Sequence, residues 1–267
     1  MLRRLVGSEM CIRDSDNVKA VIVTGEGRGF CAGADLSAGA ETFDFDNRSD
    51  RNDKKGAVSE TGSIDWSNPN IRDGGGLVTL RIFDCLKPVI SACNGPAVGV
   101  GVTMQLAMDI RLASEDARYG FVFARRGLVP EACSSWFLPK IVGISQALEW
   151  VYSGRVFSAE EALKVGLIRS IHKPNELLND AKEIAHEMTR NSAPVSVALS
   201  RQMLWKMAGA DHPMEAHKID SRGIFARGRM KDSKEGVTSF LEKRDANFTD
   251  KVNEMPDYLS LIHISEP

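Results

Sequence analysis

Two glycine-rich segments each follow an apolar run, and their pattern could place backbone N–H groups around one ligand oxygen. They are VIVTGEGRGFCAGADL (21–36) and KPVISACNGPAVGVGV (87–102). Each β-branched run indicates a buried strand, and the glycines after it permit close approach of the backbone to a ligand. Free N–H groups at a helix start point outward, so two such turns side by side could form an oxyanion hole. The alternative is that both segments are ordinary connections in a parallel sheet.

Other uses of these residue types have less support. Neither segment contains a clean GxGxxG, and no acidic residue follows a second strand about twenty residues on, as a dinucleotide site requires. The histidines outside the last nine residues are scattered and form no HExxH sequence; they are His172, His186, His212 and His217. We therefore expect no metal ion and no resident cofactor.

Four motifs, in order, resemble the crotonase or enoyl-CoA hydratase/isomerase family. They are GRGFCAGADL (27–36), KPVISACNGPAVGVGVTMQLAMDIRLAS (87–114), SGRVFSAEEALKVGLI (153–168) and FLEKRDANF (240–248). The resemblance implies an α/β fold: a crotonase-like ββα spiral core followed by a C-terminal helical trimerisation region. It also implies an acyl-CoA thioester substrate, a place in fatty-acid metabolism, and assembly as a homotrimer or a dimer of trimers.

The resemblance assigns roles to particular residues. The family's two oxyanion N–H groups fall on Ala34 and on Val100, where the family usually has glycine. Only the backbone is needed there, but the Val100 side chain narrows the acyl pocket. The family's contacts with coenzyme A fall on Ala32, Ala34, Asp35 and Leu36. Lys243 is the expected phosphate contact, reaching coenzyme A from a neighbouring subunit. Asp35 has an alternative interpretation as a helix cap.

The proton-transferring side chain decides which reaction the resemblance implies. Hydratases of this family use two glutamates, and the corresponding positions here are Thr103 and Phe123. Instead, GLVPEACSSWFLPKIVG (127–143) is similar to the segment that carries the single catalytic glutamate of Δ3,Δ2-enoyl-CoA isomerases. That similarity places the acid/base role on Glu131.

Glu131 also has a simpler interpretation, as an exposed acid that stabilises a helix start. We expect apolar neighbours to desolvate it instead and to tune it for acid/base work; they are Val129, Trp136 and Phe137. The favoured reaction moves a double bond from C3 to C2 of an enoyl-CoA. The alternatives are enoyl-CoA hydration, which needs a second acid, and a crotonase-fold protein that binds acyl-CoA or a partner without turnover.

Alternating strands and helices precede a helical second half, which predicts an α/β core over 16–190 and a helical region over 191–258. Strands are expected at 18–25, 87–94 and 109–113, with an extended stretch at 118–123. Helices are expected at 76–86, 102–108, 135–142, 144–153, 159–165, 175–191, 194–207, 213–225 and 234–244. Ser158 and Glu161 predict a capping box, and 37–73 is predicted to be a long surface loop.

The two ends of the chain differ from the rest. Segments 1–15 and 259–267 contain MCIRDS and LSLIHISEP, which resemble translated sequencing-adaptor DNA. We leave both out of the fold and function arguments. The family's N-terminal strands precede DNVKAVIVTG (16–25), and we expect them to be missing, with 1–15 in their place.

Composition sets the broad class of the protein. The chain has 267 residues, 43% hydrophobic and 26% charged, as globular domains do. Its net charge of −2 disfavours a nucleic-acid partner, and no apolar run reaches the roughly 18 residues of a membrane span. Five cysteines without CxxC spacing are expected to be free thiols in a reducing compartment, which predicts a cytoplasmic protein.

Overall fold

The computed structural model of the chain describes residues 15–43, 57–59 and 61–255. A parallel four-stranded sheet lies at its centre, in the order β1-β2-β4-β7. Its strands are β1 (Val21–Thr24), β2 (Val89–Cys93), β4 (Ile110–Ser114) and β7 (Ser170–His172). Every residue of β2 is buried, because other elements cover both faces of the sheet.

A second sheet of three strands, in the order β3-β5-β6, is joined to the segment after β1 by a bridge between Cys31 and Ala97. Its strands are β3 (Ala97–Val98), β5 (Arg118–Gly120) and β6 (Val156–Ser158). The prediction that the second half is helical throughout is therefore wrong, since β6 and β7 interrupt the helices. Each has only three residues, too few to give a periodic signal.

The predicted helices are confirmed, with ends that differ by up to three residues. They are α2 (Gly74–Phe83), α4 (Ser134–Val142), α5 (Ile144–Ser153), α6 (Ala159–Lys164), α7 (Leu177–Thr189), α8 (Pro194–Met207), α9 (Pro213–Gly228) and α10 (Lys231–Glu242). The helix expected over 102–108 begins earlier, as α3 (Val100–Thr103), and continues as the 3-10 helix η4 (Met104–Ala107). Further 3-10 turns are η1 (Gly39–Phe43), η3 (Pro69–Ile71), η5 (Ala124–Arg126) and η6 (Val252–Glu254).

The predicted helix start at Ser158 is confirmed. Its side chain accepts a hydrogen bond from the backbone N of Glu161 at 3.4 Å. The Glu161 carboxylate does not complete the reciprocal bond of a capping box. It accepts instead from the Trp150 indole at 2.7 Å and from Arg155.

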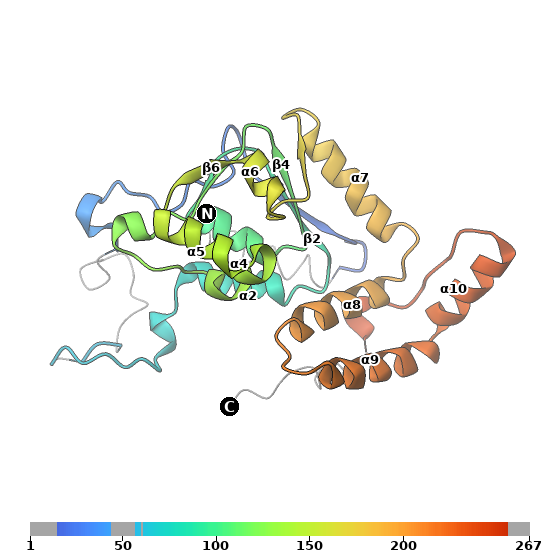
Figure 1. The fold of residues 1–267 in the computed structure, drawn as a ribbon. Helices are drawn as coiled ribbons and strands as arrows, with labels where there is room; N and C mark the ends of the chain where they lie inside the picture. Colours follow the sequence, from blue (N-terminus) through green and yellow to red (C-terminus); the bar gives the residue numbers. More distant parts are fainter. Residues whose placement is uncertain (1–14, 44–56, 60, 256–267) are drawn as a thin grey trace.

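The core divides between the two faces of the central sheet. On one face α7 packs Leu177 and Ala181 against Ile90 and Leu112. On the other, the larger cluster includes the stacked rings of Trp150 and Phe157, 4.0 Å apart, together with Tyr119 and Phe121. Figure 1 shows α7 on the opposite side of the strands from α2, α4 and α5. The glycine turns at the strand ends are thereby held in a rigid frame.

One buried arginine fastens the C-terminal helices to the core. Arg201 of α8 donates to Asp109 at 2.8 Å, and its guanidinium also donates to the carbonyl oxygens of Phe83 and Cys85. Beyond α8, α9 and α10 extend away from the sheet (Figure 1). The change from sheet to helical region falls between Thr189 and Pro194. The division of the chain at 190/191 stays a prediction.

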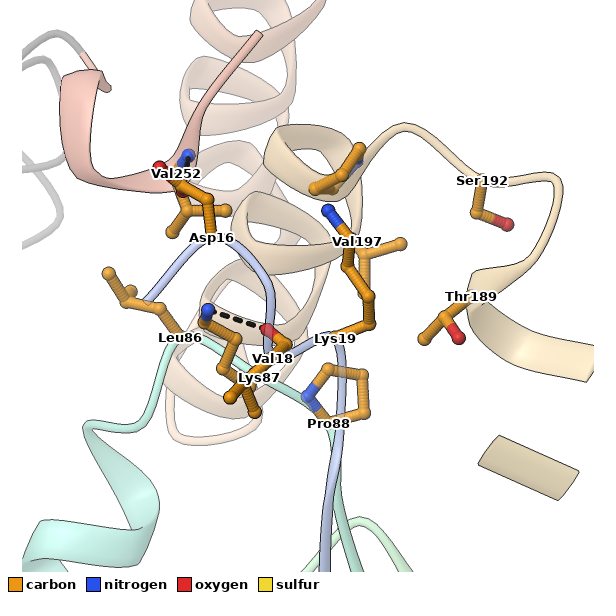
Figure 2. A pocket seen from close by; sticks show the side chains of 11 residues that line it. Asp16, Val18, Lys19, Leu86, Lys87, Pro88, Thr189, Ser192, Val197 and Val252 are labelled. Atoms are coloured by element: carbon orange, nitrogen blue, oxygen red, sulfur yellow. Dashed lines mark hydrogen bonds between the residues drawn. The ribbon is translucent and has the colours of Figure 1, made fainter. Parts of the chain in front are cut away.

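Figure 2 shows a small hollow where the chain enters β1. It has about 20 Å³ of room, and the Lys87 ammonium beside it donates to the carbonyl oxygen of Val18 at 2.7 Å. That volume holds about one water molecule, so the hollow is too small for an acyl-CoA. The end segments 1–15 and 259–267 lie outside the described residues, apart from Ser15. Within the described part, no helix is long and apolar enough to cross a membrane.

Candidate active site

The two glycine-rich turns lie against each other, as the sequence predicts. Asn94, at the end of β2, accepts from the Gly25 backbone N at 3.0 Å and donates to the Gly27 carbonyl at 2.9 Å. The Cys31 carbonyl then accepts from the Val98 backbone N at 2.9 Å. The first turn is therefore tied to the second along its whole length.

Two glycines with positive φ lie where these turns meet. Gly33 and Gly99 both have positive φ, +97° and +57°. A Cβ on Gly33 would lie 2.9 Å from the Val98 carbonyl oxygen, and one on Gly99 would lie 3.9 Å from the Gly33 Cα. Only glycine fits this backbone-to-backbone contact.

The contact brings together the two predicted oxyanion donors, because Ala34 and Val100 follow these glycines directly. Within the described residues, neither of their backbone N–H groups donates a hydrogen bond. Both remain available to a ligand oxygen. An oxyanion site needs two such donors from neighbouring turns, and the assignment of that role to Ala34 and Val100 stays a prediction.

Two helices, α2 and α3, converge on the Glu131 carboxyl group. Thr103 of α3 donates to its Oε1 at 2.7 Å. On the other side, a Cβ on Gly75 of α2 would lie 2.1 Å from Oε2 and 3.1 Å from a methyl group of Val100. The carboxyl group therefore sits beside the Val100 turn, in a space that exists because residue 75 has no side chain.

The segment that carries Glu131 has an unusual backbone. Ala132 and Cys133 both adopt left-handed conformations, with φ of +55° and +57°. Such residues cost roughly 1–2 kcal/mol each and are concentrated at functional sites. Two bonds hold the turn: the Ala132 backbone N donates to Asp73 at 3.2 Å, and the Ser134 hydroxyl donates to the Glu131 carbonyl at 2.6 Å.

The surroundings of Glu131 raise its pKa to about 7, from an ordinary value of 4.5. Burial is the largest cause, and Asp73 raises the pKa further through its hydrogen bond and its negative charge. The Thr103 hydroxyl opposes them, because it donates to the ionised form. A carboxyl group with a pKa near 7 both accepts and releases a proton readily at neutral pH.

Two details of the expected surroundings are corrected. Val129 does not cover the carboxyl group, since it is 77% exposed, and Trp136 and Phe137 pack against Phe83 instead. The left-handed turn at 132–133 separates Glu131 from α4, so sequence neighbours are not spatial neighbours. The groups that desolvate Glu131 come from the backbone of α2 and the side chain of Val100.

The two positions that carry glutamates in hydratases are both buried. Thr103 is fully buried and binds Glu131, while Phe123 packs in the main core. Neither position can supply a second carboxylate. The neighbouring acid is Asp73, which was not among the predicted site residues. The signal for it was the sequence Asp-Gly-Gly-Gly at a helix start.

The expected coenzyme A contacts lie on the exposed surface of the first turn; they are Ala32, Ala34, Asp35 and Leu36. Asp35 caps a tight turn rather than a helix, accepting from the Ser37 backbone N at 2.9 Å. Lys243 ends α10, whose contacts are mainly with α9, so a single chain does not bring it to the glycine turns. In the described residues no three metal-binding side chains gather in one place.

Comparison with known proteins identifies the family. The sequence pattern of the enoyl-CoA hydratase/isomerase family matches residues 73–251. The chain is 36% identical over 255 residues to enoyl-CoA hydratase ACTT3 of Alternaria alternata, covering 95% of this chain and 78% of that protein. It is 30% identical over 249 residues to 1,2-epoxyphenylacetyl-CoA isomerase of Escherichia coli (strain K12), covering 90% and 84%.

A solved structure shows the same fold. It is a probable enoyl-CoA hydratase/isomerase from Mycobacterium abscessus, with a TM-score of 0.79 and 30% identity, covering 93% of this chain and 88% of that one. The fold, the paired glycine turns and these similarities lead to one conclusion: the chain belongs to the enoyl-CoA hydratase/isomerase family of crotonase-fold enzymes.

Proposed function

We propose that this enzyme isomerises 3-enoyl-CoA thioesters to 2-enoyl-CoA, with Glu131 as its single acid/base. The observation that carries the proposal is the half-buried Glu131 carboxyl group beside Val100, with a pKa near 7, at a site whose hydratase positions hold Thr103 and Phe123. Isomerisation needs one proton carrier, and this site holds one such group in reach of the glycine turns.

The proposed reaction has two proton-transfer steps. The Glu131 carboxylate takes a proton from C2, and the electron pair of the broken C–H bond moves into the thioester, giving an enolate. The N–H groups of Ala34 and Val100 stabilise the enolate oxygen; one such donor is typically worth about 10²–10³ in rate. Glu131 returns the proton at C4, which leaves the double bond between C2 and C3. Substrate and product are isomers, so no other reactant is consumed.

Hydration of 2-enoyl-CoA is the second candidate. Asp73 favours it, because it places another carboxyl group beside Glu131, and the Alternaria alternata relative is named a hydratase. Against it, Asp73 Oδ1 already accepts from the backbone N–H groups of Gly76 and Ala132, so this side chain is engaged in holding α2 and the Glu131 segment. A third possibility is a protein that binds acyl-CoA without turnover. Either reaction, once observed, would exclude it.

The test is to assay 3-enoyl-CoA and 2-enoyl-CoA side by side at equal enzyme concentration. We expect conversion of the 3-enoyl substrate and little or no uptake of water by the 2-enoyl substrate. Faster hydration than isomerisation would favour the second candidate. Saturable binding of acyl-CoA by calorimetry without either reaction would favour a binding protein.

We also propose that the protein assembles as a homotrimer or a dimer of trimers in the cytoplasm. Large apolar side chains are exposed on the C-terminal helices, including Phe225 of α9 and Phe240 of α10, the latter 81% exposed. Large apolar side chains gathered on an exposed surface commonly mark an interaction site. A neighbouring copy would bring Lys243 to the coenzyme A phosphates. Sedimentation analysis tests the assembly, and a monomer at micromolar concentration would contradict it.

A further inference from the structure

Asp73 links two elements that lie far apart in the sequence. As the N-cap of α2, its Oδ1 accepts from the Gly76 backbone N at 2.5 Å. The same oxygen accepts from the Ala132 backbone N at 3.2 Å, in the strained turn directly after Glu131. One carboxylate oxygen therefore fixes the start of α2 and the Glu131 segment together.

Thr103 holds the carboxyl group itself from the side of α3. It is fully buried, and its hydroxyl donates to Glu131 Oε1 at 2.7 Å. A hydroxyl donor is best satisfied by an ionised carboxylate, whereas an adjacent anion disfavours a second negative charge. Asp73 and Thr103 thus act on Glu131 in opposite directions.

We propose that Asp73 and Thr103 are opposed positioning residues for Glu131, with Thr103 favouring its ionised form and Asp73 its protonated form. The proposal rests on the proposed function only in treating Glu131 as the group that moves the proton. Neither residue needs to touch the substrate.

The charges around the site agree with this arrangement. The titratable groups that face Glu131 are Asp73 before α2 and Cys133 before α4, while α3 contributes the uncharged Thr103. The negative charges of Asp73 and Glu131, together with burial, raise the pKa of the Cys133 thiol. Within the described residues, no cation forms an ion pair with Asp73 or Glu131.

Two nearly isosteric variants test the proposal without requiring turnover. Asp73→Asn keeps an oxygen for the helix cap but removes the charge, and Thr103→Val keeps the shape but removes the donor. The Glu131 carboxyl carbon is followed by NMR in protein labelled with ¹³C-glutamate and is assigned by its absence in Glu131→Gln. The chemical shift of this carbon is recorded as a function of pH. We expect the pH midpoint of the Glu131 titration to fall by about one unit in Asp73→Asn and to rise by about one unit in Thr103→Val.

The pH midpoint of kcat/KM should move in the same two directions. Ser158→Ala removes the cap of α6 and is the matched control for the loss of a cap; it should leave the Glu131 midpoint unchanged. If Asp73→Asn does not fold, Asp73→Ser serves, because serine also caps helices and carries no charge.

Shifts in the same direction in both variants, or no shift in either, would overturn the proposal. Opposite shifts in a protein that does not isomerise 3-enoyl-CoA would leave the positioning roles intact and remove the proposed reaction. Isomerisation of 3-enoyl-CoA without any shift of the Glu131 midpoint would support the proposed reaction and overturn the positioning roles of Asp73 and Thr103.

Discussion

Two partly buried carboxyl groups in this protein have opposite surroundings. Asp109 is fully matched by donors: Arg201 and the Val89 backbone N bind its Oδ2 at 2.8 and 2.7 Å, and the Trp205 indole binds its Oδ1 at 2.7 Å. Glu131 has one hydroxyl donor, a neighbouring carboxylate and no ion-pair partner among the described residues.

The difference separates a structural acid from a reactive one. A buried charge is tolerated when it is paired and its remaining lone pairs accept hydrogen bonds, as at Asp109. The surroundings of Glu131 destabilise its ionised form, which raises its pKa to about 7, so it exchanges a proton near neutral pH. The family's fold supplies both sites within one core: the first fastens α8, and the second faces the glycine turns.

The largest effect is expected at Asp109. Asp109→Asn leaves Arg201 without its counter-ion and turns an amide N–H toward one of the three donors. Breaking a buried pair typically costs about 3–5 kcal/mol. Urea unfolding should show a loss of that size in the free energy of unfolding. A loss below about 1 kcal/mol would mean that the network is not structural.

The same acid-to-amide change at Glu131 should stabilise the protein. The folded pKa lies above the unfolded one, so ionising Glu131 costs stability. That cost is absent below about pH 4.5, grows as the pH rises, and is complete above about pH 7. At pH 8 we expect urea unfolding of Glu131→Gln to give a free energy of unfolding higher than that of the native protein by on the order of 1–3 kcal/mol. At pH 4 the two proteins should have the same free energy of unfolding. Destabilisation at pH 8 would place Glu131 with Asp109 as a structural acid.

A methyl group at residue 75 tests whether the space around Glu131 is specific. Gly75→Ala would place its Cβ 2.1 Å from Oε2, so the carboxyl group must move. The gain in helix propensity, up to about 1 kcal/mol, is opposed by overpacking, because the Cβ would also lie 3.1 Å from Val100 and Ala132. We expect isomerase activity to fall about tenfold or more, since small displacements of catalytic groups have such effects. Unchanged activity would show that the Glu131 position is not critical.

The smallest effect is expected at the half-exposed pair of Glu161 and Arg155. The Arg155 hydrogen bonds lower the pKa of Glu161, so this pair stabilises the fold above the ordinary glutamate pKa and loses that effect as the pH falls. Arg155→Met should cost about 0.2–1 kcal/mol at pH 7 and less at pH 3. A loss of free energy of unfolding as large as that expected for Asp109→Asn would show that burial does not explain the difference between the Arg201–Asp109 pair and the Arg155–Glu161 pair.

Much of the fold was predictable from the sequence because its elements give strong local patterns. The apolar runs of β1, β2 and β4 and the helical period of α5 and α8 are long enough to detect. The strands β6 and β7 are not, since three residues carry no period and their pairing depends on β5 and β4. The identity of their partners is a tertiary property.

The candidate site was predicted in part for the same reason. The two glycine turns and Glu131 each lie within a continuous stretch of sequence that forms a motif. The structure brings these stretches together. Asp73 and Gly75 contact Glu131 across more than fifty residues, and no local pattern shows such a contact. The expected neighbour Val129 is exposed, and the left-handed backbone of Ala132 and Cys133, which separates Glu131 from α4, is not predicted by their residue types.

The most direct test of the account is the turnover of 3-enoyl-CoA by Glu131→Gln. Glutamine keeps the size of the side chain but cannot exchange a proton. General acid–base groups typically contribute about 10²–10⁴-fold, so kcat should fall at least about a hundredfold while the Kd for an acyl-CoA stays within a few-fold. Isomerisation near the native rate would contradict the assignment of Glu131, and loss of binding together with turnover would show that Glu131 shapes the pocket instead.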